Sequence, residues 1–240
     1  MLKNKLIVAL DVSGANEARS IVAELGQQVG AFKIGLQLFV SAGPEFVREM
    51  TSSGFNVFLD LKFHDIPNTV AKAAVEAARL GVWMFNVHAL GGGEMMRRTV
   101  DDVTSICEKE NLSRPLIIGV TVLTSADQMT LQQVGINDRL ENEVQRLARL
   151  AEASGLDGVV ASPLECRLLR ASDIRDDFKI VTPGVRLITA TNDDQKRVTT
   201  ADAALDAGAD YIVVGRPILN APDRAAAVEE ILGEMQPVGR

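Results

Sequence analysis

Four charged side chains near the ends of three short apolar segments are the residues best suited to chemistry. Asp11 follows the first segment, Lys33 lies in the second, and Asp60 and Lys62 lie two residues apart in the third. If the third segment is a strand, Asp60 and Lys62 project from the same face, because side chains alternate along a strand. One such pair could be a purely structural ion pair. Charges of alternating sign on adjacent strand ends are harder to explain by stability, so we interpret them as a functional network.

The two histidines of the chain lie near these charges in the sequence. His88 ends a fourth apolar segment, where a histidine can simply hydrogen-bond a neighbouring carbonyl, and we favour that interpretation. His64 lies beyond the third segment and is expected in a loop. Neither histidine is therefore assigned a catalytic role.

A second group of residues suggests that the chain recognises a phosphate. Gly215 and Arg216 follow the last apolar segment, where backbone N–H groups at a helix start and a bidentate arginine would bind an anion. Arg186 stands in another glycine-containing turn, at residues 183–186. An ordinary turn with a solvated arginine looks the same, so the prediction depends on the position of Arg216 after the eighth strand-like segment.

Eight strand-like segments alternate with longer amphipathic ones. The strand-like segments are residues 6–10, 31–34, 56–59, 84–87, 116–120, 158–161, 179–181 and 211–214. Eight units in 240 residues give 30 residues each, which predicts parallel βαβ units closed into a (β/α)8 TIM barrel, with residues 1–240 as a single α/β domain. An open doubly wound sheet is the competing fold, but residues 11–15 lack its glycine-rich first turn.

Helical patterns and long connections separate these strands. The helical patterns include residues 15–25, 44–52, 70–80, 142–153 and 200–207. The two long connections are residues 121–142 and 184–199. Long loops in a compact domain usually bind or cover a ligand, so both are expected to be lids or binding loops.

The composition argues against several classes of protein. With 25 basic and 32 acidic residues the net charge is −7, and no basic run is present, so nucleic acid is not expected as a partner. Cys107 and Cys166 fit no zinc motif or disulfide framework and are expected to be reduced. The apolar runs are too short for a signal peptide or a membrane span. We therefore expect a soluble, cytoplasmic protein with no membrane partner.

With these residues in place, the sequence resembles the bacterial orotidine 5′-monophosphate decarboxylase family over nearly the whole chain. The most specific match is Asp-Leu-Lys-Phe-His-Asp-Ile-Pro-Asn-Thr at residues 60–69, which is similar to the family's signature around its catalytic lysine. Residues 7–11, 33–35, 119–125, 182–186 and 214–218 also look like family blocks, in the family's order.

The resemblance implies decarboxylation of orotidine 5′-monophosphate to uridine 5′-monophosphate and CO2 in pyrimidine biosynthesis, by a homodimer without metal or organic cofactor. Lys62 would be the proton donor, in a catalytic group with Asp60, Asp65 and Lys33. Asp65 and Thr69 would reach the site of the partner subunit. The implied substrate-binding residues are Asp11 and Lys33 at the ribose, Asp60 at the carboxylate, Ile66 and Thr69, Thr124 and Ser125 at the pyrimidine, and Arg186, Gln195, Gly215 and Arg216 at the phosphate.

The chemistry of this reaction explains why such charges would be needed. Loss of CO2 from C6 of a pyrimidine leaves a carbanion-like centre with no adjacent carbonyl to delocalise its charge. A cationic Lys62 can supply both electrostatic stabilisation and a proton. Burial disfavours a charged ammonium, whereas the carboxylates of Asp60 and Asp65 favour it. An alternating array of Lys33, Asp60, Lys62 and Asp65 is therefore predicted to keep Lys62 protonated.

The segment after Lys62 is the predicted contact with a second subunit. Pro67 prevents an early return to strand pairing, and Asn68 or Thr69 can cap the helix at residues 70–80. That helix carries five alanines, which suit either a close subunit contact or packing on its own barrel. These alanines are Ala71, Ala73, Ala74, Ala77 and Ala78.

Two alternative functions remain open. A related barrel decarboxylase of β-keto sugar acid phosphates shares Asp-x-Lys in its third strand but uses magnesium, and it needs a further carboxylate near the second strand. Here that region offers Lys33 and no acid until Glu45. The other alternative is a catalytically silent barrel that senses a nucleotide, because a fold alone does not establish activity.

Overall fold

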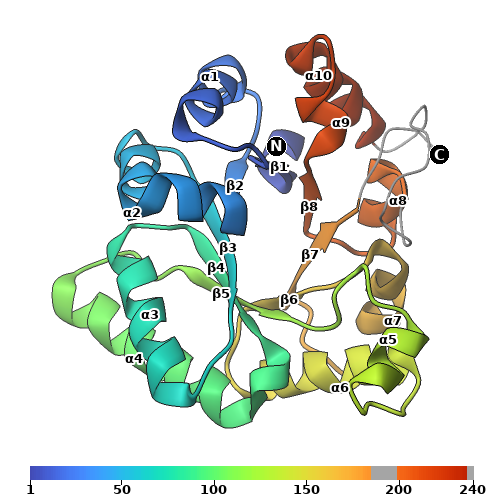
Figure 1. Ribbon diagram of the computed structural model, residues 1–240. Helices are drawn as coiled ribbons and strands as arrows, with labels where there is room; N and C mark the ends of the chain where they lie inside the picture. Colours follow the sequence, from blue (N-terminus) through green and yellow to red (C-terminus); the bar gives the residue numbers. More distant parts are fainter. Residues whose placement is uncertain (185–198, 237–240) are drawn as a thin grey trace.

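The computed structural model describes residues 1–184 and 199–236. Eight parallel strands close into a barrel in chain order, and the last strand pairs with the first (Figure 1). The strands are β1 Leu6–Ala9, β2 Ala31–Gly35, β3 Val57–Phe63, β4 Met84–His88, β5 Leu116–Val120, β6 Gly158–Val160, β7 Lys179–Pro183 and β8 Tyr211–Val214. The ends of each strand lie within two residues of the prediction, except that β3 continues to Phe63 rather than ending at residue 59.

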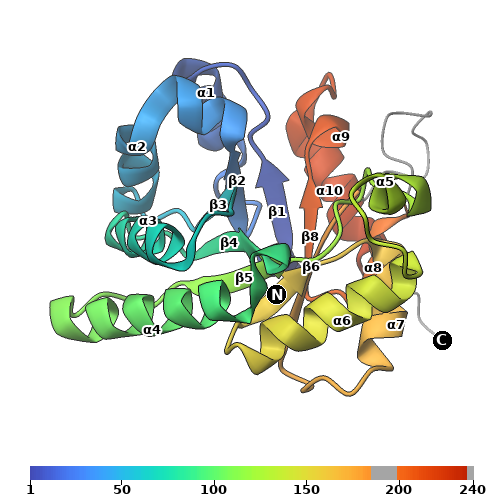
Figure 2. The same cartoon turned by 60° about the horizontal axis from the view of Figure 1, so that its bottom comes forward.

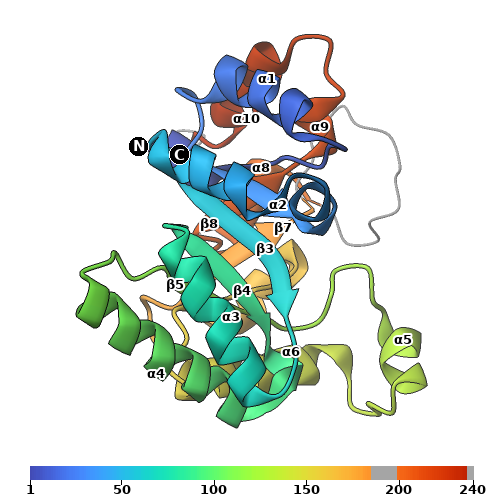
Figure 3. The same cartoon turned by 60° about the vertical axis from the view of Figure 1, so that its left-hand side comes forward.

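The connecting helices surround the barrel (Figures 1 and 2). The longer helices are α1 Ala15–Leu25, α2 Leu36–Ser52, α3 Pro67–Arg79, α4 Gly92–Glu110, α6 Leu140–Ala153 and α10 Arg224–Glu234. The shorter ones are α5 Gln128–Gln133, α7 Cys166–Arg170, α8 Ala201–Asp206 and α9 Arg216–Leu219, with 3-10 turns η1 Leu2–Lys5, η2 Ala89–Gly91 and η3 Pro163–Glu165. Helix α3 lies beside α4, and α1 lies beside α10, so the first and last helices are neighbours (Figure 3).

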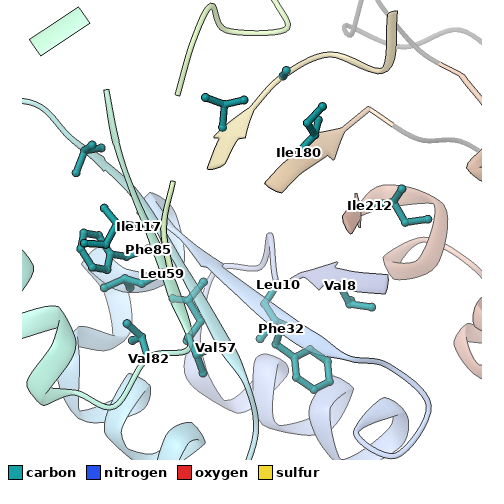
Figure 4. Close-up of a cluster of buried hydrophobic side chains, with 14 of the residues drawn as sticks. Val8, Leu10, Phe32, Val57, Leu59, Val82, Phe85, Ile117, Ile180 and Ile212 are labelled. Atoms are coloured by element: carbon teal, nitrogen blue, oxygen red, sulfur yellow. The ribbon is translucent and has the colours of Figure 1, made fainter. Parts of the chain in front are cut away.

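Two apolar layers follow from the alternation of side chains along the strands. Ile7 and Phe58 belong to the cluster that fills the inside of the barrel. Val8, Leu59 and Phe85 belong to the larger cluster between strands and helices (Figure 4). Full burial of a side chain of this size contributes roughly 1.5–3 kcal/mol relative to exposure. Because side chains fill the inside of the barrel, the polar side chains at the strand ends lie above a packed core and not above an open channel.

Helices α2 and α3 begin three or more residues before their predicted starts. Helix α2 starts before residue 44, and Gly43, at φ 70° and ψ −178°, interrupts it, so the predicted helix is its second part. Helix α3 starts at Pro67, because proline suits the first helical turn, where its missing N–H is not needed. The prediction that Asn68 or Thr69 caps α3 was therefore wrong: the N-cap is Ile66, without a side-chain cap.

The cysteines and the two long connections bear on further expectations from the sequence. Cys107 and Cys166 are free cysteines, as expected; both are also buried, and burial raises the pKa of both thiols. The connection after β5 contains the short helix α5, whereas residues 185–198 of the second long connection lie outside the described residues. Over the described ranges, no helix has the length and apolar character needed to cross a membrane.

Candidate active site

The four charged residues form one continuous chain of ion pairs across the carboxyl ends of β1, β2 and β3. Lys33 Nζ lies 3.1 Å from Asp11 Oδ1 and 3.2 Å from Asp60 Oδ2. Lys62 Nζ lies 2.6 Å from Asp60 Oδ1. The side chains of Lys33 and Asp60 are each 12% exposed, whereas those of Asp11 and Lys62 are 51% and 30% exposed. The two central residues of this row of ion pairs are therefore buried, and the residues at its two ends, Asp11 and Lys62, reach solvent.

The two central residues keep each other charged. Burial would lower the pKa of Lys33, but the carboxylates of Asp60 and Asp11 outweigh burial and raise it above its ordinary value. Burial would likewise raise the pKa of Asp60, but the ammonium groups of Lys33 and Lys62 outweigh it and lower that pKa. The site thus holds a buried ammonium beside a buried carboxylate, both ionised at neutral pH.

Two glycines leave the space that these side chains need. A Cβ on Gly35 would lie 3.1 Å from Lys33 Nζ, and a Cβ on Gly215 would lie 3.1 Å from Asp11 Oδ2. Both distances are shorter than most contacts of a real Cβ atom. Gly215 directly follows β8 and is the N-cap of α9, so one of the predicted phosphate-binding residues adjoins the charged network.

Lys62 lies on an irregular part of β3. The pairing of β3 with β4 passes from Leu59–Phe85 to Phe63–Val87, so three residues of β3 lie opposite one residue of β4. Lys62 has a φ of 52°, and Asn111 is the other described non-glycine residue with a positive φ. A backbone of this kind costs roughly 1–3 kcal/mol and persists when its surroundings impose it. Such bulges re-aim side chains, and this one places the lysine at the end of the network.

Asn86 on β4 is a site residue that the sequence analysis did not identify. Its Oδ1 accepts a hydrogen bond of 2.8 Å from the backbone N–H of Lys62, and its Nδ2 donates one of 2.7 Å to Asp60 Oδ1. The residue is 1% exposed. The sequence did carry a signal for it, because an asparagine interrupts an apolar strand in phase with the interior-facing Met84.

The two histidines meet beside this network. The rings of His64 and His88 have centroids 5.3 Å apart, tilted by 36°. His88 Nδ1 is buried without a hydrogen-bond partner in the described part of the chain, so the expected bond to a carbonyl is not made there. Burial, His64 and Lys62 together lower the pKa of His88. His64 follows the end of β3, as predicted.

Asp65 does not join the network of its own chain. Its Oδ1 accepts a hydrogen bond of 2.6 Å from the backbone N–H of Ile66, and no ion pair connects it to Lys62 among the described residues. Asp65 and Thr69 are exposed, and Ile66 is 66% exposed. Within one chain, the predicted alternating array therefore ends at Lys62.

The remaining predicted site residues lie on other loops. Thr124 and Ser125 follow β5, and Arg216 begins α9 with an exposed side chain. Arg186 and Gln195 lie outside the described residues. Across residues 1–184 and 199–236, no three His, Cys, Asp or Glu side chains are grouped so that they could hold a metal ion.

Comparisons with known proteins agree with each other. A family model described as "Orotidine 5'-phosphate decarboxylase / HUMPS family" matches residues 4–231. An orotidine 5′-phosphate decarboxylase of Heliobacterium modesticaldum is 53% identical over 234 residues, which cover 97% of this chain and 96% of that protein. One of Syntrophotalea carbinolica is 52% identical over 233 residues, covering 97% of this chain and 95% of that protein. The crystal structure of orotidine 5′-phosphate decarboxylase from Lactobacillus acidophilus matches with a TM-score of 0.85 at 38% identity, covering 96% of this chain and 98% of that chain.

Proposed function

This chain belongs to the orotidine 5′-phosphate decarboxylase / HUMPS family, and from that membership we propose that it converts orotidine 5′-monophosphate into uridine 5′-monophosphate and CO2. It would thus act as a carbon–carbon lyase in pyrimidine biosynthesis. The observation that carries the proposal is the chain of ion pairs from Asp11 through Lys33 and Asp60 to Lys62. These groups supply a cation and a carboxylate at one barrel mouth, where active sites of this fold lie.

The proposed reaction breaks the bond between C6 of the pyrimidine and its carboxylate carbon. The electron pair of that bond stays on C6, CO2 leaves, and the Lys62 ammonium donates a proton that forms the new C6–H bond. The neutral amine then regains a proton from water. Before the reaction, the ion pair with Asp60 at 2.6 Å fixes the direction of the ammonium, so the donor is oriented in advance.

Asp60 and Lys33 support this step from the buried part of the network. Asp60 would lie beside the substrate carboxylate and hold the Lys62 ammonium, while Lys33 keeps Asp60 ionised and, with Asp11, reaches the ribose. A single well-placed donor contributes about 3–4 kcal/mol. Very slow reactions need about 20 kcal/mol or more of barrier lowering. Binding energy from the phosphate, at Gly215 and Arg216, must therefore contribute to the rate.

Metal independence is part of the same proposal. A divalent cation beside Lys62 would oppose a second positive charge there, and both carboxylates of the network already face ammonium groups. The magnesium-dependent alternative needs a carboxylate near the second strand. The first acid that follows β2 along the chain, Glu45, lies on α2, is exposed, and pairs with Arg48 at 3.1 Å. The residues around β2 therefore favour the nucleotide decarboxylase.

Ultraviolet absorbance during incubation with orotidine 5′-monophosphate tests the proposal. We expect the spectrum to change from that of the orotate nucleotide to that of the uridine nucleotide, with one CO2 released per nucleotide. Binding without a spectral change would instead indicate a nucleotide sensor. Turnover of a β-keto sugar acid phosphate, but not of the nucleotide, would indicate the magnesium-dependent decarboxylase.

A further inference from the structure

Asn86 closes a ring of hydrogen bonds around the lysine and the carboxylate that the proposed reaction uses. Its Oδ1 accepts from Lys62 N–H at 2.8 Å, its Nδ2 donates to Asp60 Oδ1 at 2.7 Å, and the same oxygen lies 2.6 Å from Lys62 Nζ. One side-chain amide therefore holds the main chain of the lysine and the side chain of its partner. Since Asn86 belongs to β4, this ring ties both residues to the neighbouring strand.

The irregular pairing of β3 explains why such a ring is needed. Three residues of β3, from Asp60 to Lys62, lie opposite Asn86 alone. A bulge disrupts the regular ladder of hydrogen bonds between strands, so backbone groups within it need other partners. The amide oxygen of Asn86 provides that partner for Lys62, whose φ of 52° is unfavourable for a lysine. The side chain thus supports the backbone conformation that aims the ammonium.

The chemistry of the site calls for an amide at this position. A backbone N–H only donates and a carboxylate only accepts, so the side chain between them must offer one acceptor and one donor. Asparagine offers both, whereas an ionised aspartate would lack the donor and add a negative charge beside Asp60. Water cannot replace the amide without a rearrangement, because Asn86 is 1% exposed.

We propose that Asn86 is a positioning residue for proton transfer, which sets the place of the Lys62 ammonium through the Lys62 main chain and the Asp60 carboxylate. The inference rests on the proposed function. It predicts a defect in the chemical step rather than in nucleotide binding, because Asn86 contacts the groups that face C6 and not the residues assigned to the phosphate.

Two substitutions and one control test this role. Asn86→Asp keeps an acceptor for Lys62 N–H and, when ionised, loses the donor, whereas Asn86→Leu removes both. Thr99→Val removes a hydroxyl that is equally buried but, within the described part of the chain, bonds only to Met95 O, at 2.8 Å, inside α4. The measurements are kcat and KM for orotidine 5′-monophosphate, the Kd for uridine 5′-monophosphate, and deuterium exchange at C6 of that product in D2O. Exchange reports on proton transfer without the loss of CO2.

We expect kcat to fall about 100-fold in both Asn86 variants, as a small misplacement of a catalytic group can produce. Product affinity should stay near that of the wild type, and C6 exchange should fall in parallel with kcat. Lowering the pH should restore part of the rate of Asn86→Asp alone, because a protonated carboxyl both donates and accepts. Thr99→Val should retain the wild-type kcat.

Several outcomes would overturn the inference. These are a near-normal kcat in a folded Asn86 variant, a loss of product affinity as large as the loss of kcat, and a loss of kcat without a loss of exchange. If neither variant folds, Asn86 is an architectural residue and the assignment is wrong. A wild-type protein that fails to turn over orotidine 5′-monophosphate would refute both the proposed function and the role of Asn86. Normal wild-type turnover with unaffected variants refutes the role alone.

Discussion

Lys62 and Asp60 lie two residues apart on β3, and their side chains meet with Nζ 2.6 Å from Oδ1. Side chains at such positions of a regular strand share a face but stand roughly parallel. Here the bulge between Leu59 and Phe63 and the positive φ of Lys62 bend the strand, and Asn86 supports the bend. The proposed proton donor is thus aimed before the substrate arrives.

Replacement of Lys62 should separate folding and binding from turnover. Lys62→Ala and Lys62→Gly both remove the ammonium, and glycine also tolerates the positive φ without strain. Both variants should fold and bind uridine 5′-monophosphate. Their kcat should fall by about 100-fold to 10,000-fold, which is the contribution expected of a general acid. Lys109→Ala removes an exposed lysine from the end of α4 and should retain full activity. Substantial turnover by a pure Lys62→Gly preparation would exclude Lys62 as the donor.

The fold could be predicted from the sequence because its signals are local. Apolar runs marked all eight strands, and their alternation with helical patterns indicated a barrel. The starts of helices were less predictable. The non-helical backbone of Gly43 divides α2 into two parts, of which the sequence predicted only the second, and Pro67 opens α3 where a polar cap was expected. In both cases the deciding factor is the φ angle that a glycine or a proline permits, which hydrophobic periodicity does not report.

The candidate site was only partly predictable, because part of it depends on contacts between strands. The types and spacing of Asp60 and Lys62 suggested an ion pair, which the structure contains. Asn86 matters through the register of β4 against a bulge in β3, and no local pattern specifies that register. The alanines of α3 were ambiguous in the sequence, and four of them prove to be buried within the chain. These four are Ala71, Ala74, Ala77 and Ala78.

The buried pair of Lys33 and Asp60 should give stability that does not vary with pH in the neutral range. Because folding raises the pKa of Lys33, its ion pairs stabilise the folded protein fully at pH values below 10.5, the ordinary pKa of lysine. This stabilisation is lost as the pH rises through the raised pKa. Because folding lowers the pKa of Asp60, its ion pairs stabilise the folded protein fully at pH values above 3.8, the ordinary pKa of aspartate. This stabilisation is lost as the pH falls through the lowered pKa. Asp60→Asn should therefore lower the free energy of unfolding by about 3 kcal/mol near neutral pH, the cost of breaking a buried pair. Urea titrations should show this difference shrinking below about pH 4, and a difference that grows there would contradict the assignment.

Arg216 should matter for the phosphate of the substrate rather than for its pyrimidine. Arg216→Ala should lower kcat/KM for the nucleotide at least about tenfold, which corresponds to the loss of one charged hydrogen bond. The poor rate with the nucleoside, which lacks the phosphate, should barely change. The matched control is Arg224→Ala, which removes an arginine that pairs with Glu24 at 3.1 Å on the helix layer. Equal losses with both substrates would place the action of Arg216 elsewhere.

Removal of metal ions should leave the reaction unchanged. After dialysis against EDTA, the protein should have the same kcat as before dialysis in the ultraviolet assay, measured in buffer freed of divalent cations. The physical reason is that Lys33 and Lys62 already provide the positive charge that the site needs. A rate that is lost on dialysis and restored by magnesium would favour the decarboxylase of β-keto sugar acid phosphates.

Mixed dimers test whether Asp65 acts in the site of a neighbouring chain. Asp65 is exposed and bonds only its own Ile66 N–H among the described contacts, so its carboxylate can face another subunit. Lys62→Ala and Asp65→Asn should each be inactive alone. If they are unfolded and refolded together, random pairing makes about half the dimers mixed, each with one site free of both lesions, so activity should recover to about a quarter of wild type. If Asp65 acts in its own chain, every site keeps one lesion. An inactive mixture in which mass spectrometry detects mixed dimers would therefore refute the shared site.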